Sequence, residues 1–78
     1  MLHELKTWPL YFEALINGMK NFEIRFNDRD YQIGDTLILK EFNIEMQIYT
    51  GRVTRRRVRY IFREEFALQK GYICMGFW

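Results

Sequence analysis

Hydrophobic and polar residues alternate along most of the chain, but one interval near the amino-terminal end has helical periodicity. Between Leu10 and Ile16, apolar residues recur four positions apart, a spacing that places side chains on one face of a helix. Trp8-Pro9 stands just before this interval, and proline is tolerated in the first turn of a helix. Gly18 follows it, where a left-handed residue commonly ends a helix. The pattern predicts one helix that packs on a sheet.

A strict alternation of period two follows over residues 20 to 26, and it predicts a β-strand. Side chains two positions apart share one face of a pleated strand. One face would carry Phe22, Ile24 and Phe26, and the other would carry Asn21, Glu23, Arg25 and Asn27. We expect the apolar row to face the core, which leaves the polar row for solvent or for a site.

The segments after residue 30 are predicted to form further strands. Residues 36 to 42 form a mostly buried strand after a Gly34-Asp35 turn, and a Thr50-Gly51 turn joins strands over 45 to 49 and 52 to 62. In the latter strand, one face would carry Val58, Tyr60 and Phe62. A short helical turn over 64 to 71 and a closing strand over 72 to 78 follow. This order predicts an α+β domain in which about five to six strands curl into a small mixed β-barrel.

Composition narrows the class of protein. The chain has 78 residues, 49% of them hydrophobic, which suits a single domain over residues 1–78 with one core. Cys74 is the only cysteine, which excludes an intrachain disulfide and a cysteine-rich zinc site and is typical of a reducing compartment. No apolar run has the length of a signal peptide or of a membrane span. We therefore expect a cytoplasmic protein without membrane contact, metal or cofactor.

Positive charge is concentrated in one segment, although the formal net charge is only +2. The segment from residue 52 to residue 59 contains Arg52, Arg55, Arg56, Arg57 and Arg59. Such a density can hold a polyanion, because each phosphate that is contacted releases counterions. It can equally protect an exposed edge strand against aggregation. Both interpretations stay open on the sequence alone.

An ordered set of residues carries a family resemblance. The motif Gly18-x-Lys20-x-x-Glu23-x-Arg25, followed by Gly34-Asp35, resembles the signature of the ASCH domain, a family within the PUA-like superfamily of small pseudo-barrels. Other matching features are His3-x-Leu5-Lys6, Pro9-x-Tyr11-Phe12, Asn27-Asp28-Arg29 and Tyr49-Thr50-Gly51-Arg52. These resemble a short branch of the family found in bacteria and their phages. The resemblance covers nearly the whole chain.

The resemblance implies a fold and a class of ligand. It implies a PUA-like β-barrel with its helix beside a cleft, and a cleft that accommodates RNA or a nucleobase. Some relatives have nuclease activity, and others deacylate a modified cytidine. In the deacylating relatives a threonine nucleophile stands three residues after the lysine, where this chain has Glu23. A threonine-dependent amidohydrolase is therefore not expected here.

Lys20, Glu23 and Arg25 form the central candidate site. A guanidinium can donate two hydrogen bonds to a phosphate or to a base edge. An ammonium adds a point charge, and a carboxylate can accept from an exocyclic amine. This combination suits nucleotide recognition. The alternative is a solvated strand face on which Glu23 and Arg25 pair with neighbouring strands. In a catalytic site, Glu23 would be the general base and Lys20 the acid or positioning group.

Further residues are predicted to contact nucleic acid around this row. They are Lys6, Asn27, Arg29, Tyr49, Arg52, Arg55 and Arg57. Two accessory candidates are His3, as a proton shuttle or hydrogen-bond donor, and Trp8, as a surface on which a base stacks. The alternatives are a structural histidine and a core tryptophan. The aspartates at 28, 30 and 35 are interpreted as turn residues rather than metal ligands.

Three functional hypotheses follow from these residues. The leading one is a nucleic-acid-binding module, for RNA rather than DNA. In it the central row lines the bottom of a cleft, and the arginine-rich strand binds the nucleic-acid backbone. The second is a hydrolase acting on RNA or on a modified nucleoside, with Glu23 and Lys20 as its acid-base pair. The third is a protein-interaction domain of a mobile element. The sequence leaves the choice among them, and the oligomeric state, open.

Overall fold

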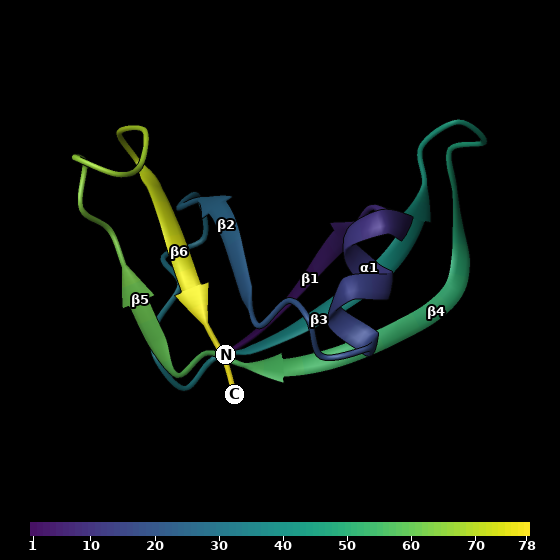
Figure 1. Cartoon of the computed structure of the whole chain (residues 1–78), viewed down its shortest axis with the longest axis horizontal. Helices are drawn as coiled ribbons and strands as arrows, with labels where there is room; N and C mark the ends of the chain where they lie inside the picture. The colour runs from purple at the N-terminus through teal and green to yellow at the C-terminus, as the bar shows by residue number, and fades with distance from the viewer.

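The computed structural model describes all residues, 1–78, and has a predominantly β fold with one short helix (Figure 1). In chain order the elements are β1 (Leu2–Thr7), α1 (Pro9–Ile16), β2 (Phe22–Phe26), β3 (Thr36–Asn43), β4 (Ile48–Arg57), β5 (Tyr60–Phe62) and β6 (Tyr72–Gly76). The strands form two three-stranded sheets, in the orders β1-β3-β4 and β2-β6-β5. The predicted count of about five to six strands, with one helix near the amino-terminal end, is confirmed.

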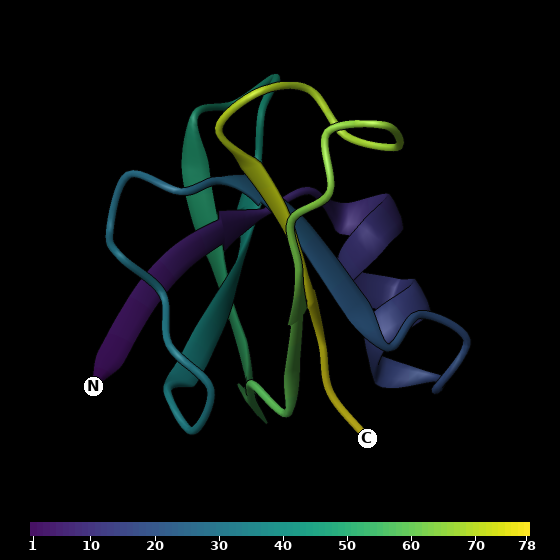
Figure 2. The same cartoon turned by 90° about the vertical axis from the view of Figure 1, so that its left-hand side faces the viewer.

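The two sheets stay open instead of closing into the predicted barrel. β1 and β3 are parallel, and all other pairs are antiparallel. In Figure 1 the sheets form the arms of a V, with α1 beside the arm that holds β1, β3 and β4, and Figure 2 shows strands of both sheets around a common interior. β1 and β2 are edge strands of different sheets, so no backbone ladder joins them. We call the gap between β1 and β2 the seam.

β1 is absent from the predicted elements, although it is the parallel partner of β3. Its residues alternate between exposed and buried, and His3, Leu5 and Thr7 are the buried ones. The same alternation is present in the sequence, but its inward row contains a histidine and a threonine. Polar residues in this row make the strand signal weak, because core-facing positions are normally apolar.

The predicted faces of β2 are wrong. Glu23 is only 4% exposed, whereas the apolar row is roughly half exposed: Phe22, Ile24 and Phe26. Alternation decides which residues share a face, but it does not decide which face is covered. Glu23 and Arg25 pair with Met75 and Ile73 of the neighbouring strand β6, which are both buried, so this face of the sheet is the inner one. The polar row of β2 therefore faces the interior, at the seam.

The segment from residue 44 to residue 62 differs from the predicted hairpin. The turn lies at residues 44–47, where a strand was expected to begin, and β4 then continues through Thr50 and Gly51. Gly51 has a φ of 96° and lies at the shift in register between β3 and β4, which is a bulge position suited to glycine. The chain then changes sheets at the buried Val58. Tyr60 and Phe62 consequently belong to a different sheet from the residues before Val58.

α1 has the predicted bounds and is tied to the first sheet. Trp8 is its N-cap residue, and Gly18 after its end has a φ of 81°. Phe12 and Leu15 are the residues of the helix that are buried. Arg56 of β4 donates from Nη2 to the carbonyl oxygen of Leu15 at 2.9 Å, which adds a cationic donor to an acceptor at the end of the helix that also accepts from the Gly18 N–H. Helix and β4 therefore hold each other in place.

The carboxy-terminal segment forms one turn and then the central strand of the second sheet. The N–H groups of Ala67 and Leu68 both donate to the Glu64 carbonyl oxygen at 3.2 Å, so the predicted helical turn is a single turn without a helix. The predicted closing strand is confirmed as β6. None of the helical structure in this protein has the length and apolar character needed to cross a membrane.

His3 and Asp35 join β1 to the turn before β3. His3 Nε2 lies 2.8 Å from Asp35 Oδ2, and both side chains are buried. Asp35 also accepts from the Gln32 N–H and from the amino-terminal ammonium of Met1, each at 3.0 Å. Burial alone would raise the pKa of Asp35, but these bonds outweigh it and bring the pKa to about 2. The Gly34-Asp35 pair thus has a structural contact with His3.

Candidate functional site

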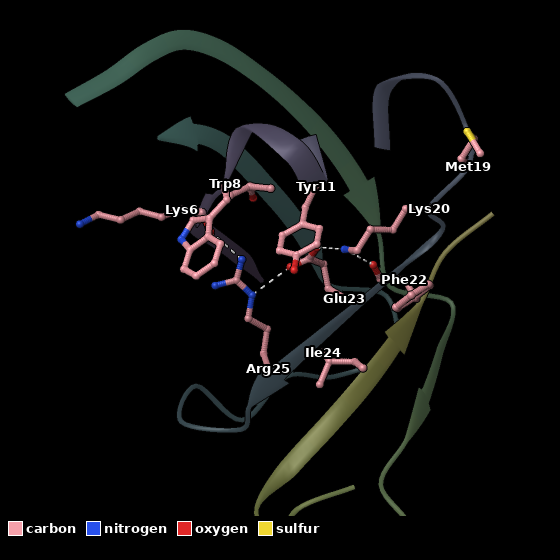
Figure 3. A pocket seen from close by; sticks show the side chains of 10 residues that line it. Lys6, Trp8, Tyr11, Met19, Lys20, Phe22, Glu23, Ile24 and Arg25 are labelled. Atoms are coloured by element: carbon pink, nitrogen blue, oxygen red, sulfur yellow. Dashed lines mark hydrogen bonds and ion pairs between the residues drawn. The ribbon is translucent and has the colours of Figure 1, made fainter. Parts of the chain in front are cut away.

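A pocket of about 660 Å³ opens at the seam (Figure 3). One wall comes from the end of β1 and the first turn of α1, and the other comes from β2 and the residues before it. The lining residues are Lys6, Thr7, Trp8, Tyr11, Met19, Lys20, Phe22, Glu23, Ile24 and Arg25. The volume lies within the range of small-ligand sites. The structure therefore brings together the predicted central row with Lys6 and Trp8.

Glu23 is the buried centre of this pocket. Lys20 Nζ donates to its Oε1, and Arg25 Nε donates to its Oε2 at 2.9 Å, as the dashed lines of Figure 3 show. Lys20 also donates to the Phe22 carbonyl oxygen at 2.7 Å. A buried carboxylate needs such partners, because burial without compensation is costly. Glu23 consequently fixes the positions of both cations.

Two arginines bridge the seam that the backbone leaves open. Arg25 Nη2 donates to the carbonyl oxygen of Lys6 at 2.7 Å, and Arg29 Nη1 donates to that of Glu4 at 2.9 Å. Both acceptors belong to β1, whose outer edge has no neighbouring strand. The arginine side chains thus take the place of a missing strand at this edge. The structure gives Arg29 this bridging role and leaves it outside the pocket.

An aromatic wall faces the charged row. Trp8 is 54% exposed, so it is not a core residue, and its ring is stacked on that of Tyr11 with centroids 6.0 Å apart. In Figure 3 both rings lie over the side of the pocket that holds Arg25 and Glu23. Lys20 Nζ lies 5.7 Å from the Tyr11 ring centroid. A planar ligand can stack on this wall while its charged groups contact the cations.

Sequence reasoning missed several residues of the pocket. They are Thr7, Tyr11, Met19, Phe22 and Ile24. Tyr11 follows Trp8 by three positions, which is the helical spacing of side-chain neighbours, so the pair was detectable. Thr7 was detectable only through the alternation of β1, which the predicted elements do not include. Phe22 and Ile24 were assigned to the core.

The arginine-rich strand lines a second, smaller hollow of about 250 Å³. Its lining residues are Asn21, Arg55, Arg56, Arg57, Arg59, Phe77 and Trp78. Asn21 lies between Lys20 and Phe22, which line the first pocket, so the two hollows adjoin the same short segment. The structure therefore places Arg55 and Arg57 near the central row, but in a separate concavity.

Other predicted contacts lie outside both hollows. Arg52 pairs with Glu13 at 3.3 Å and approaches the buried Glu41 at 3.7 Å, and the Glu13 hydrogen bond raises the pKa of Arg52. Asn27 accepts from the Tyr31 N–H at 3.1 Å and stabilises a turn. Tyr49 packs edge-on against Phe42, with ring centroids 5.0 Å apart. His3 has the contact with Asp35 described above.

The pocket as a whole favours an anionic ligand with an aromatic part. It contains the cationic groups of Lys20 and Arg25 and a single carboxylate, that of Glu23, whereas the Lys6 side chain extends away from the pocket (Figure 3) and its ammonium lies 4.4 Å from the Phe42 ring centroid. Both oxygens of Glu23 already accept from cations, so it has little capacity left for a ligand donor. The aromatic wall and the excess of positive charge are the two features that such a ligand would use.

Comparison with known proteins places the chain in a family. The model of the family described as "Domain of unknown function (DUF3850)" matches residues 2–77. The chain is also 40% identical over 57 residues to a protein of Escherichia phage P2 described as "Uncharacterized 12.9 kDa protein in GpA 3'region". That match covers 73% of this chain and 50% of the phage protein, so it spans about half the length of this relative. Because the family model spans nearly the whole chain, this protein belongs to the DUF3850 family.

Proposed function

We propose that this protein is an RNA-binding module whose pocket at the seam takes one unstacked nucleotide. The observation that carries the proposal is the exposed Trp8–Tyr11 stack beside the cationic groups of Lys20 and Arg25, in a pocket of about 660 Å³. Proteins recognise single-stranded RNA by splaying bases out and stacking them on aromatic side chains. The base would lie on the aromatic wall, and the cations would contact the phosphates.

The second hollow extends the proposed path of the strand. Arg55, Arg57 and Arg59 are exposed, and none of their side chains donates a hydrogen bond to another residue. Arg56, by contrast, is held by the end of α1. Free guanidinium groups can contact phosphates without breaking any bond in the fold. We infer that the backbone on one side of the bound nucleotide runs over Asn21 toward these arginines.

The resemblance to ASCH domains supports the same proposal. We propose a relationship to that family and to its PUA-like superfamily, because Lys20, Glu23 and Arg25 of the signature all line one pocket beside a helix. The resemblance implies a cleft for RNA or a nucleobase at that place. The Gly34-Asp35 part of the signature has a structural contact instead.

A hydrolase acting on RNA or on a modified nucleoside is the less favoured alternative. Glu23 would act as general base only after one of its two cations had moved away, because both carboxylate oxygens are occupied. The contact between Lys20 and Glu23 does provide a proton-transfer pair within the pocket. Turnover of RNA or acylated nucleosides that disappears in Glu23→Gln, with the fold intact, would make the enzyme the better description.

Replacing Trp8 by alanine tests the aromatic wall. Base stacking on an aromatic side chain contributes about 1 to 3 kcal/mol, so we expect the Kd for short single-stranded RNA to rise roughly 5- to 150-fold. Fluorescence anisotropy of labelled RNA measures this. Phe66→Ala is the matched control, because Phe66 is 85% exposed and lines neither hollow. Unchanged binding in Trp8→Ala, or equal losses in both variants, would contradict the proposal.

The salt dependence of binding tests the arginine-rich hollow. For single strands, each phosphate contact contributes about 0.7 to the slope of log K against log salt concentration. The double variant Arg55→Gln/Arg57→Gln is therefore expected to reduce the magnitude of this slope by about 1.4. Lys70→Gln, at an exposed position outside both hollows, should leave the slope unchanged. An unaltered slope in the double variant would remove these arginines from the interface.

A further inference from the structure

The end of the pocket where β1 meets α1 contains an unpaired buried hydroxyl. Thr7 lines the pocket and is 3% exposed, and its Oγ1 has no hydrogen-bond partner. No other buried side-chain nitrogen or oxygen in the protein lacks a partner. A buried polar group without a partner destabilises a fold, so such groups are uncommon and call for a cause. A bound ligand that supplies the missing partner is one such cause.

The first turn of α1, which follows Thr7 and contributes Trp8 and Tyr11 to the pocket lining, has free backbone donors. Phe12 is the first residue whose N–H bonds back into the helix, to the Trp8 carbonyl oxygen at 2.8 Å. The N–H groups of Leu10 and Tyr11 precede it, and no side chain caps the helix. The amino-terminal end of a helix carries a partial positive charge and attracts anions. Trp8 and Tyr11, which line the pocket, belong to this turn.

The charges around this end favour one kind of ligand group. Lys20 and Arg25 are cationic, and the Glu23 carboxylate already accepts from both of them. Free donors therefore exceed free acceptors at the bottom of the pocket. A phosphate has several acceptor oxygens and negative charge, so it can accept from the surplus donors. An exocyclic amine is a donor and would have few free acceptors here.

We propose that Thr7 and the first turn of α1 form a phosphate subsite, the Thr7 subsite, for the nucleotide whose base stacks on Trp8 and Tyr11. A rotation about the Cα–Cβ bond of Thr7 moves its hydroxyl between staggered positions, so the hydroxyl is free to reorient when a phosphate binds. The inference rests on the proposed nucleotide binding, and it adds that the pocket selects ligands that carry a phosphate group. Thr7 thereby determines the preference for nucleotides over nucleosides.

The test compares Thr7→Val and Thr7→Ser with the unaltered protein. Each is titrated by NMR with the four nucleoside 5′-monophosphates and with the corresponding nucleosides. We expect the unaltered protein and Thr7→Ser to prefer the monophosphates, and Thr7→Val to lose about tenfold of that preference, the effect of one hydrogen bond to a charged group. Valine has nearly the shape of threonine and removes the unpaired hydroxyl, so Thr7→Val should be as stable as the unaltered protein in urea or more stable.

Two results would overturn the Thr7 subsite. One is a ratio of monophosphate to nucleoside affinity that is the same in Thr7→Val as in the unaltered protein. The other is a marked loss of stability in Thr7→Val, because it would mean that the hydroxyl has a structural partner, such as a bound water.

An RNA titration of the same proteins separates this inference from the proposed function. Binding of RNA by the unaltered protein, with an unchanged monophosphate preference in Thr7→Val, would remove the subsite and leave the RNA-binding module. Binding of monophosphates without binding of RNA would keep the subsite and remove the module. If the unaltered protein bound neither RNA nor monophosphates, both proposals would fail.

Discussion

Glu23→Ala is expected to lower the free energy of unfolding by about 3 kcal/mol, because removing one partner of a buried ion pair leaves charge uncompensated. The Lys20 and Arg25 side chains are only 16% and 27% exposed, so without the carboxylate two like charges would lie together in a poorly hydrated place. Small domains have about 5 to 15 kcal/mol of stability in total. Urea denaturation at neutral pH, followed by circular dichroism, measures the loss.

Glu4→Ala is the matched control for this prediction. Glu4 also pairs with a lysine, Lys40 at 2.6 Å, but its side chain is 61% exposed. Exposed pairs contribute little, so we expect a change below about 1 kcal/mol. Similar losses in the two variants would mean that the burial of Glu23 has no special role in stability. Glu23→Gln, which keeps the shape and one acceptor oxygen, should fall between the two.

Asp35→Asn is expected to lower the free energy of unfolding by about 2 kcal/mol at neutral pH, in a manner that depends on pH. In the unfolded chain Asp35 takes up a proton near pH 3.8, whereas in the folded protein its pKa is about 2. The ionised carboxylate therefore stabilises the fold above the unfolded pKa, and this contribution is lost as the pH falls toward 2. Urea denaturation at a series of pH values from 7 to 2 should show the two proteins converging in stability.

Asp28→Asn is the control for the acid dependence. Asp28 is exposed, and its side chain makes no hydrogen bond. We expect its replacement to leave the stability and its pH profile nearly unchanged. A difference between Asp35→Asn and the unaltered protein that stayed constant down to pH 2 would contradict the linkage to Asp35 ionisation. It would point instead to a loss of packing around His3.

Local patterns located most of the elements. The helical spacing and Trp8-Pro9 predicted α1, alternation predicted β2, and a mostly apolar run after the Gly34-Asp35 turn predicted β3 close to its observed bounds. These signals act over a few residues, so no distant contact is needed to interpret them. The hairpin around Gly51 was wrong for the same reason. Glycine at a positive φ suits both a turn and a bulge, and only the pairing of β4 with β3 distinguishes them.

The central row of the site was predicted from a motif, but its geometry was not. The spacing of Lys20, Glu23 and Arg25 indicated a shared site, and the structure brings the three side chains into direct contact. Thr7 and Tyr11 come from other elements and entered the pocket through the packing of β1 and α1. No motif near the central row refers to them. The spacing of Trp8 and Tyr11 indicated that these two rings are neighbours, but only the tertiary structure showed that they face the central row.

The sequence by itself determined the helix, most strands, the concentration of arginine and the residues of the central row, because each depends on neighbours close along the chain. Only the tertiary structure decided that the polar face of β2 is buried, that the chain changes sheets at Val58, and that the sheets stay open at the seam. Those outcomes depend on which distant strand covers a face or leaves it free, and period-two alternation is identical for both faces of a strand. The pocket exists because β1 and β2 do not pair and Arg25 and Arg29 bridge them instead.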